Sequence, residues 1–180
     1  MITRILLSIL LLTNSLGLSA QRVLSSKNGI IKFNASTPVE TIRAINLQAE
    51  SKLAEKTGQL VVSVLIKGFK FDNQLMQDHF NENYLESTKY PRAVFKGYIN
   101  KMQEIDLSKN GIYPITADGT LTLHGVSQRV ITKGNVMVNS GGVTIESIFK
   151  VALRDYNING SYIGDKIARE VEVSVKCKFD

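Results

Sequence analysis

The chain has 180 residues, of which 43% are hydrophobic and 21% charged, and its formal net charge at pH 7 is +6. This composition is ordinary for a globular protein, and the length fits one domain behind a short processed segment. Lys and Arg are scattered singly, without the clusters and interleaved aromatic residues of a nucleic-acid surface, so we expect no nucleic-acid partner. A preference for anionic lipids stays a minority interpretation of the positive charge.

The N-terminus has the features of a signal peptide. Arg4 supplies a positive charge ahead of an apolar run from Ile5 to Leu12, and Leu18-Ser19-Ala20 offers small residues for a signal peptidase. These features predict a signal peptide over residues 1–20, cleavage near Ala20–Gln21, and a periplasmic or secreted protein. The run is shorter than a membrane span needs, so we expect no integral membrane segment in the mature chain. An uncleaved anchor is the alternative.

The remaining residues, 21–180, contain no linker, low-complexity run or internal repeat, which predicts a single domain. Cys177 is the one Cys, so no disulfide is expected. It falls on the apolar face of an alternating last strand, which predicts a buried, unreactive thiol. The sequence leaves a homodimer open.

Most of the chain alternates apolar and polar residues with the period of a half-buried strand. Extended segments are expected at Val23–Ala35, Glu40–Leu47, Glu50–Glu55, Leu60–Lys67, Ala93–Lys101, Ile112–His124, Arg129–Val138, Val143–Arg154 and Ile167–Phe179. Glu50–Glu55 also has the composition of a helix, but a turn follows it directly, which favours a strand. About eight strands in up-and-down order, with one consistently apolar face, predict an all-β antiparallel sheet that closes into a barrel.

One short amphipathic helix interrupts this pattern. Its expected apolar face carries Leu75, Met76, His79, Phe80, Asn83 and Tyr84. Asp72 stands where a short acceptor side chain caps a first turn, and Pro91 prevents the helix from continuing. The helix is expected to lie on the sheet or to close one end of the barrel.

Three short motifs occur in order along the chain. The first joins Asp78-His79-Phe80 to Lys89-Tyr90-Pro91 and Phe95-Lys96; the second is Gly119–Val126, and the third is Arg154–Ile158. Together they resemble the YceI-like family of bacterial lipid-binding proteins from about Leu60 to the C-terminus. The resemblance implies an eight-stranded lipocalin-like barrel that encloses a polyisoprenoid or fatty-acyl ligand. Residues 21–59 depart from the pattern, because the family's first strands often carry a Trp and this chain has none.

Signals for catalysis are weak. The two His residues, His79 and His124, do not stand in metal-ligand spacings, and no phosphate-binding glycine loop or nucleophile motif is present, so neither a metal nor a cofactor is expected. A hydrolase or isomerase that uses His79 with Asp78 is the less favoured alternative. Arg154 and Asp155 are interpreted as a local ion pair.

We therefore expect a non-enzymatic barrel that binds, sequesters or transports a long-chain amphiphilic lipid. The side chains expected to line its interior are Leu65, Phe69, Phe80, Tyr84, Phe95, Leu121, Leu123 and Phe149. Those expected near a head group are Lys70, His79, Lys89 and Arg92. By residue pattern alone a solid core ranks ahead of a hollow tunnel, and the resemblance to the family reverses this order. A solid-core structural or interaction module that acts through its surface is the alternative.

Overall fold

The computed structural model describes residues 22–179, so the expected signal peptide lies outside the described residues. Nine strands carry most of the chain: β1 (Val23–Asn34), β2 (Arg43–Ala54), β3 (Gln59–Leu65), β4 (Lys70–Phe71), β5 (Arg92–Ile99), β6 (Gly111–Leu123), β7 (Val126–Asn139), β8 (Gly142–Ala152) and β9 (Glu170–Phe179). Short helical segments are η1 (Ile66–Gly68), α1 (Gln74–His79), η2 (Phe80–Tyr84), η3 (Met102–Glu104) and η4 (Leu153–Tyr156).

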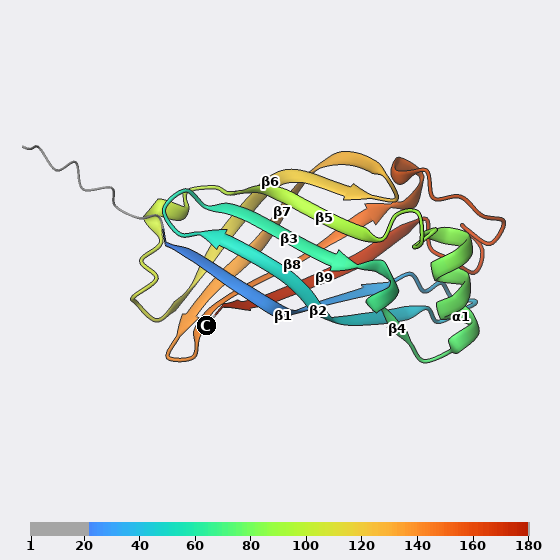
Figure 1. Ribbon diagram of the computed structural model, residues 1–180, viewed down its shortest axis with the longest axis horizontal. Coiled ribbons are helices and arrows are strands. Elements are labelled where there is room, and N and C mark those ends of the chain that lie inside the picture. Colours follow the sequence, from blue (N-terminus) through green and yellow to red (C-terminus); the bar gives the residue numbers. More distant parts are fainter. Residues whose placement is uncertain (1–21, 180) are drawn as a thin grey trace, which may run out of the picture.

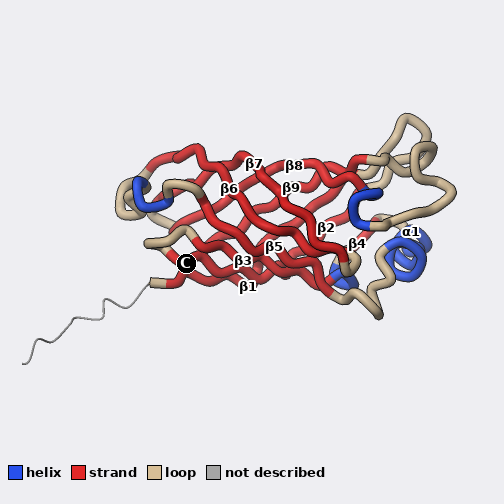
Figure 2. Tube along the Cα trace, turned by 90° about the horizontal axis from the view of Figure 1, so that it is seen from above, coloured by secondary structure: helices blue, strands red, loops and turns tan. Residues whose placement is uncertain are grey.

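Eight strands form a closed antiparallel barrel, as the alternation predicted. The order around the wall is β1-β9-β8-β7-β6-β5-β3-β2, and β1 pairs with β2 to complete the circle. The two-residue β4 adds to the end of β2. Figures 1 and 2 show the elongated barrel from two sides, with α1 at one end of it.

Some boundaries differ from the prediction. The two extended segments expected between Glu40 and Glu55 form one strand, β2, and the segment with helical composition is extended, as favoured. A turn was expected at Gly125–Ser127, but the chain reverses at His124 and Gly125, which have φ of 51° and 74°. Two successive positive φ angles are typical of the tightest hairpins, so β7 begins at Val126 instead of Arg129.

The helical segment is shorter than expected and continues as a wider turn. The side chain that caps α1 is Asn73, which accepts a hydrogen bond from the Met76 backbone amide, so the assignment of the cap to Asp72 was wrong. The predicted apolar face was also partly wrong: Leu75 is 62% exposed and His79 is exposed. The contacts of this segment with the core come from Phe80 and Tyr84 in η2 and from Leu85, which follows it.

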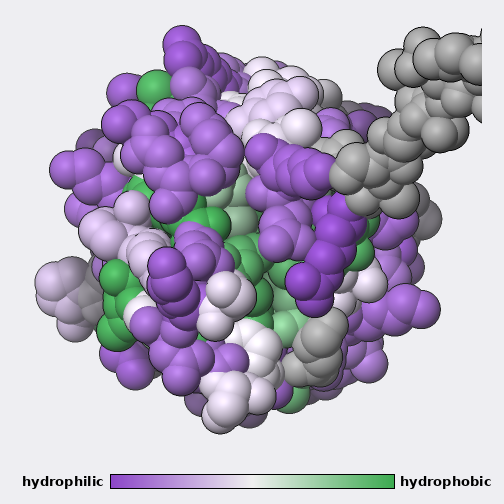
Figure 3. Space-filling model, turned by 90° about the vertical axis from the view of Figure 1, so that its left-hand side faces the viewer, coloured by the Kyte–Doolittle hydropathy of each residue, from purple (hydrophilic) through white to green (hydrophobic). Residues whose placement is uncertain are grey.

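The two ends of the barrel are built differently. The end that carries the β2–β3, β5–β6 and β7–β8 connections, here called the packed end, has a solid core. Its nearly inaccessible side chains are Leu53, Ile99, Met102, Val136 and Phe179. Figure 3 faces this end, where polar residues surround apolar ones at the centre. The opposite end, called the hollow end, carries α1 and the long β1–β2, β3–β5 and β8–β9 connections (Figure 1).

Candidate ligand-binding cavity

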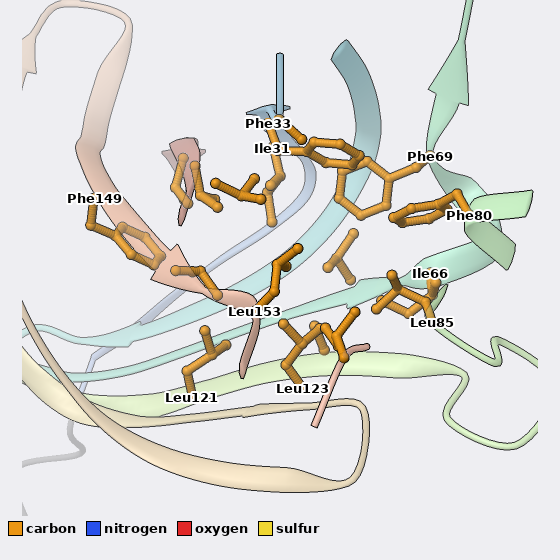
Figure 4. A pocket seen from close by; sticks show the side chains of 18 of the residues that line it. Ile31, Phe33, Ile66, Phe69, Phe80, Leu85, Leu121, Leu123, Phe149 and Leu153 are labelled. Carbon is orange, nitrogen blue, oxygen red and sulfur yellow. The ribbon is translucent and has the colours of Figure 1, made fainter. Parts of the chain in front are cut away.

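A cavity of about 490 Å³ runs from the end of the barrel next to α1 into its interior, as far as Leu60, Ile145 and Cys177. This volume is within the usual range for small-molecule pockets, roughly 300–1,000 Å³. Its wall comes from the inward positions of the alternating strands, for example Val171, Val173 and Val175 of β9. Figure 4 shows Phe and Leu side chains from several strands directed into this space. Leu53, Val136 and Phe179 are not among its lining residues, so the cavity ends against the packed end.

Seven of the eight side chains predicted to line the interior do so. They are Phe69, Phe80, Tyr84, Phe95, Leu121, Leu123 and Phe149. The placement of Leu65 inside the barrel was wrong, because this side chain is 47% exposed and faces outward. In β3 the inward positions are Leu60, Val62 and Val64, so Leu65 falls on the other face. Binding of a ligand by the inward set stays a prediction.

An aromatic cluster forms one side of the cavity near its mouth. The Phe80 ring stacks on Phe33 at 5.4 Å between centroids, and it meets the rings of Phe69 and Phe71 at 5.8 and 5.1 Å. Such pairs each contribute about 0.5–1.5 kcal/mol beyond the burial of area. The cluster therefore attaches the helical segment to β1 and β4 and presents aromatic faces to the cavity.

The polar residues at the mouth come from three loops. Glu40 lies in the β1–β2 loop, Asn73 and His79 lie at α1, and Lys166 lies in the β8–β9 loop. The Lys166 ammonium stands 5.3 Å from the centre of the Tyr162 ring, which also lines the cavity. One carboxylate and one ammonium balance in formal charge, so the mouth has no concentration of positive charge for an anionic head group.

Of the four residues predicted near a head group, only His79 lines the cavity. Lys70 is exposed on β4. Lys89 lies 3.8 Å from Glu86, and Arg92 donates to Glu50 at 3.2 Å and to Ser63 at 2.8 Å. None of these three cations is among the residues that line the cavity. The structure does not bring them together with His79 in the cavity lining, and binding of a head group by these residues stays a prediction.

Tyr84 adds a neutral donor to the lining of the mouth. Burial, followed by the nearby Tyr162 phenol, raises the pKa of Tyr84 above its ordinary value. A phenol with a raised pKa stays protonated at physiological pH and offers one O–H donor. The mouth thus provides amide, phenol and imidazole groups suited to an uncharged polar group.

The three sequence motifs meet at His124, behind the cavity wall. The His124 ring packs edge-on against Tyr90, with 4.7 Å between centroids; its Nδ1 lies 3.0 Å from the Tyr156 carbonyl oxygen, and its Nε2 lies 2.8 Å from the Glu86 carboxylate. A carbonyl only accepts, so Nδ1 carries a proton and donates. This group, His124 with Glu86, Tyr90 and Tyr156, ties the β3–β5 loop, the β6–β7 turn and η4 together.

Sequence reasoning missed this role of His124, although the residue lies within a motif. The signal available in the sequence was that Glu86, His124 and Asn157 all stand at expected loops or turns. In the structure each of these residues has a positive φ, of 42°, 51° and 55° respectively. Non-glycine residues rarely adopt this conformation unless tertiary contacts hold them there. These turns therefore depend on the contacts around His124, which bring together segments far apart in the sequence.

In the described residues no group of three or more His, Cys, Asp or Glu side chains is placed to hold a metal ion. Asp78 accepts a hydrogen bond from the Gln74 amide at 2.7 Å. The Arg154–Asp155 ion pair predicted from sequence is present, with 3.4 Å between Nε and Oδ1. Among residues 22–179, no helix is long and apolar enough to cross a bilayer.

Comparison with known proteins places this arrangement in a family. The family model described as the YceI-like domain matches residues 24–179. A polyisoprenoid-binding domain from Saccharophagus degradans superposes with a TM-score of 0.76 at 12% identity, over 89% of this chain and 98% of that one. BcnA from Burkholderia cenocepacia gives 0.67 at 16% identity, over 82% and 94%. At these identities the structures establish a shared fold, and a comparison with functionally curated proteins gave no match.

Proposed function

Because the chain belongs to the YceI-like family, we propose that it binds a long-chain lipid of the polyisoprenoid or fatty-acyl type in the barrel cavity. The observation that carries this proposal is the cavity itself, a space of about 490 Å³ with an almost wholly apolar lining. The name of the S. degradans relative, a polyisoprenoid-binding domain, supports the isoprenoid class. The same cavity would serve the protein whether it carries the lipid or sequesters it.

The apolar wall supplies the affinity. A chain of about fifteen carbons illustrates the size of this contribution, since burial in the cavity removes each methylene group from water. Each buried methylene contributes about 0.8 kcal/mol, which gives on the order of 10 kcal/mol before the entropic costs of binding. The mouth, with Glu40 and Lys166 in formal balance, favours an uncharged polar group over a phosphate.

The test compares two leucines that differ in the direction of their side chains. Leu121→Asn places an amide inside the cavity, and Leu65→Asn places the same group on the outer surface. Native mass spectrometry of protein that was never denatured, followed by organic extraction, is expected to recover lipid from the wild type and Leu65→Asn. Leu121→Asn should retain at least tenfold less. Recovery of no lipid from the wild type would reject the proposal.

We propose binding, and not catalysis, as the activity. His79 is exposed at the mouth, and the adjacent Asp78 carboxylate accepts from Gln74, so the pair does not have the base-and-orienting-group arrangement of a general base. His79→Ala should leave lipid recovery and biological activity within twofold of the wild type. Complete loss of activity with lipid recovery unchanged would favour the hydrolase or isomerase alternative.

Export is the remaining part of the proposal. The n-region, apolar run and small residues before Gln21 support cleavage of residues 1–20. The intact mass of the protein recovered from the periplasm or medium should begin at Gln21. A mass that retains the apolar run would favour the uncleaved anchor.

A further inference from the structure

The large apolar side chains that are exposed to solvent in residues 22–179 fall into two groups. Seven of the ten lie on strands of the barrel wall. The other three lie in connections: Val39 between β1 and β2, Leu75 in α1 of the β3–β5 connection, and Tyr162 between β8 and β9. All three connections are at the hollow end (Figure 1). In the described part of the chain, the connections of the packed end present no such side chain.

Contacts between these connections place the three side chains around one opening. Thr37 Oγ1 in the β1–β2 connection donates to the Lys166 carbonyl oxygen in the β8–β9 connection at 3.3 Å. Gly160 of the β8–β9 connection packs against the Tyr84 ring of η2 so closely that a Cβ at this position would lie 2.6 Å from Tyr84 Cε1. The β8–β9 connection therefore contacts both of the others at the mouth of the cavity.

The exposed side chains continue the apolar lining of the cavity. Leu75 is 62% exposed and Tyr162 is 50% exposed, and both are also lining residues. Val39, which is 64% exposed, precedes Glu40, a lining residue of the mouth. The apolar surface thus extends from the interior of the barrel through the mouth to the outside of the molecule.

The mouth connections have no excess of positive charge. Residues 35–42, 66–91 and 153–169 together carry six Lys or Arg and seven Asp or Glu, although the whole chain has a formal charge of +6. The Lys166 ammonium lies 5.3 Å from the centre of the Tyr162 ring. Tyr and Lys side chains of this kind suit a boundary between an apolar and an aqueous phase, because each has an apolar body and a polar tip. The mouth therefore complements a surface without net charge.

These features suit a lipid bilayer better than a protein partner. A specific protein interface buries about 800 Å² on each partner around a close-packed centre. Here the three side chains surround an opening and are interspersed with charged residues such as Glu40 and Lys166, so they do not form one close-packed surface. A bilayer is fluid, so apolar side chains that stand apart can each enter its boundary region.

We propose that the mouth of the barrel docks on a zwitterionic bilayer surface through Val39, Leu75 and Tyr162, so that the lipid ligand passes between bilayer and cavity without crossing water. This inference rests on the proposed function, because a long-chain lipid resides in membranes and its transfer into water is unfavourable. Transfer by docking requires contact between protein and bilayer. Its rate therefore depends on the amount of bilayer surface present, whereas release through water does not.

The first experiment measures the partition of the protein onto phosphatidylcholine vesicles by flotation. Val39→Asp/Leu75→Asp places charge where the side chains enter the bilayer and should lower the partition coefficient at least tenfold. Ile112→Asp, at a 69%-exposed position of β6 near the packed end, is the matched control and should change it less than twofold. Equal partition of the two variants would reject docking through the mouth.

The salt dependence of partition tests the apolar mode of docking. Wild-type partition should change less than twofold when NaCl is raised from about 0.1 M to about 1 M, since attraction between exposed charges is screened over this range and apolar burial is not. A tenfold or greater loss at high salt would show that charge drives the binding, and would reject the apolar mode.

The second experiment follows the transfer of a fluorescent prenyl probe from loaded protein to phosphatidylcholine vesicles. The wild-type rate should rise in proportion to the vesicle concentration. The rate for Val39→Asp/Leu75→Asp should be at least fivefold lower and independent of the vesicle concentration, while Ile112→Asp should behave as the wild type does. A wild-type rate that does not depend on the vesicle concentration would reject docking as the route of the ligand.

Farnesol affinity without vesicles, measured by displacement of the same probe, separates this inference from the proposed function. Val39→Asp, at a residue that does not line the cavity, should bind farnesol within twofold of the wild type and still partition at least threefold less onto vesicles. Unchanged circular dichroism and thermal midpoint verify that the variants are folded.

The remaining outcomes reject one proposal or both. If wild-type protein binds farnesol but not vesicles, docking on a bilayer is rejected in favour of a protein partner at this surface, and the proposed function stands. If sedimentation shows a dimer that Val39→Asp/Leu75→Asp dissociates, the surface belongs to a second copy of the chain and docking is rejected. If wild-type protein does not bind farnesol, the isoprenoid assignment is rejected, and docking as the route of the ligand with it.

Discussion

The packed and hollow ends of the barrel are made by the same strands but filled to different degrees. At the packed end, Leu53 and Val136 are fully inaccessible, and Phe179 and Met102 are 1% exposed. At the hollow end, inward residues such as Phe95 and Phe149 stay partly accessible because they border the cavity. Atoms that border a void lose the dispersion contacts that a filled core provides. The packed end therefore supplies most of the stability, and the hollow end supplies the binding site.

The side chains that close the packed end have no counterpart at the hollow end. Met102 belongs to η3 in the β5–β6 connection, and Phe179 is the last inward residue of β9, so a connection and a strand end fill this end together. At the hollow end the corresponding covering element, α1, has no buried residue, and the segment packs on the core through Phe80 and Tyr84 of η2 and through Leu85. A barrel closed firmly at one end and covered loosely at the other allows a ligand in without loss of the fold.

The largest expected effect distinguishes two phenylalanines. Phe179→Ala removes a fully buried side chain from the packed core and should lower the free energy of unfolding by about 3–5 kcal/mol. Phe149→Ala, on the cavity wall, should lower it by less than about 2 kcal/mol, because part of the ring is already accessible, and should weaken lipid binding. Urea unfolding of the lipid-free proteins measures both. Equal losses would mean that the two ends do not differ in packing.

A larger side chain should lower the stability of the packed end but should mainly reduce ligand affinity in the cavity. Val138→Phe overfills the packed end and should cost about 1–3 kcal/mol of unfolding free energy. Val173→Phe occupies cavity space and should leave stability nearly unchanged while it lowers farnesol affinity. The measurements are thermal unfolding and probe displacement. Strong destabilisation by Val173→Phe would indicate that the cavity is too small for a ligand.

The contacts of His124 should contribute a smaller amount at the hollow end. Glu86→Ala removes the acceptor for His124 Nε2 and should cost about 1 kcal/mol, because the carboxylate is partly exposed to solvent. Glu86→Gln should cost less than Glu86→Ala, since the Gln side chain can keep one hydrogen bond to Nε2. Faster amide hydrogen exchange in the β3–β5 loop is the expected signature of Glu86→Ala. Glu82→Ala, at an exposed position of η2, is the control.

The smallest expected effect concerns Cys177 at the packed end. Burial raises the pKa of this thiol above its ordinary value of 9.0. Above about pH 9 the unfolded chain loses the thiol proton while the folded chain keeps it, so stability falls as the pH rises. The fall from pH 8 to pH 10 should be smaller in Cys177→Ala, by less than about 1 kcal/mol. An identical pH dependence in both proteins would show that the thiol has no part in it.

Local sequence patterns were sufficient to predict the antiparallel barrel. A period of two, interrupted by turn residues, identified the strands, and closure followed from the need to remove sheet edges. Cys177 was correctly placed in the core by the same alternation. Errors arose where the pattern does not discriminate. In the run Leu60–Leu65 nearly every residue is apolar, so the inward face could not be chosen and Leu65 was assigned to the wrong side.

The candidate site was predicted less completely. Most of its aromatic and aliphatic wall followed from alternation and the family resemblance, but Lys89 and Arg92 were placed near a head group only because they flank the helix in sequence. Their orientation depends on partners such as Glu50, which lies far away in the chain. The meeting of Tyr90, His124 and Tyr156 likewise requires three loops to be folded together.

By itself the sequence determined an antiparallel β-barrel with an apolar interior and one short helical interruption, because side-chain alternation is a local property of the chain. Only the tertiary structure decided how far that interior is filled, where the ladder between β7 and β8 stops, and which loops surround the mouth. These features depend on the fit of side chains from distant strands, and on where neighbouring strands separate. No local sequence pattern encodes the fit of these side chains or the place where two strands separate.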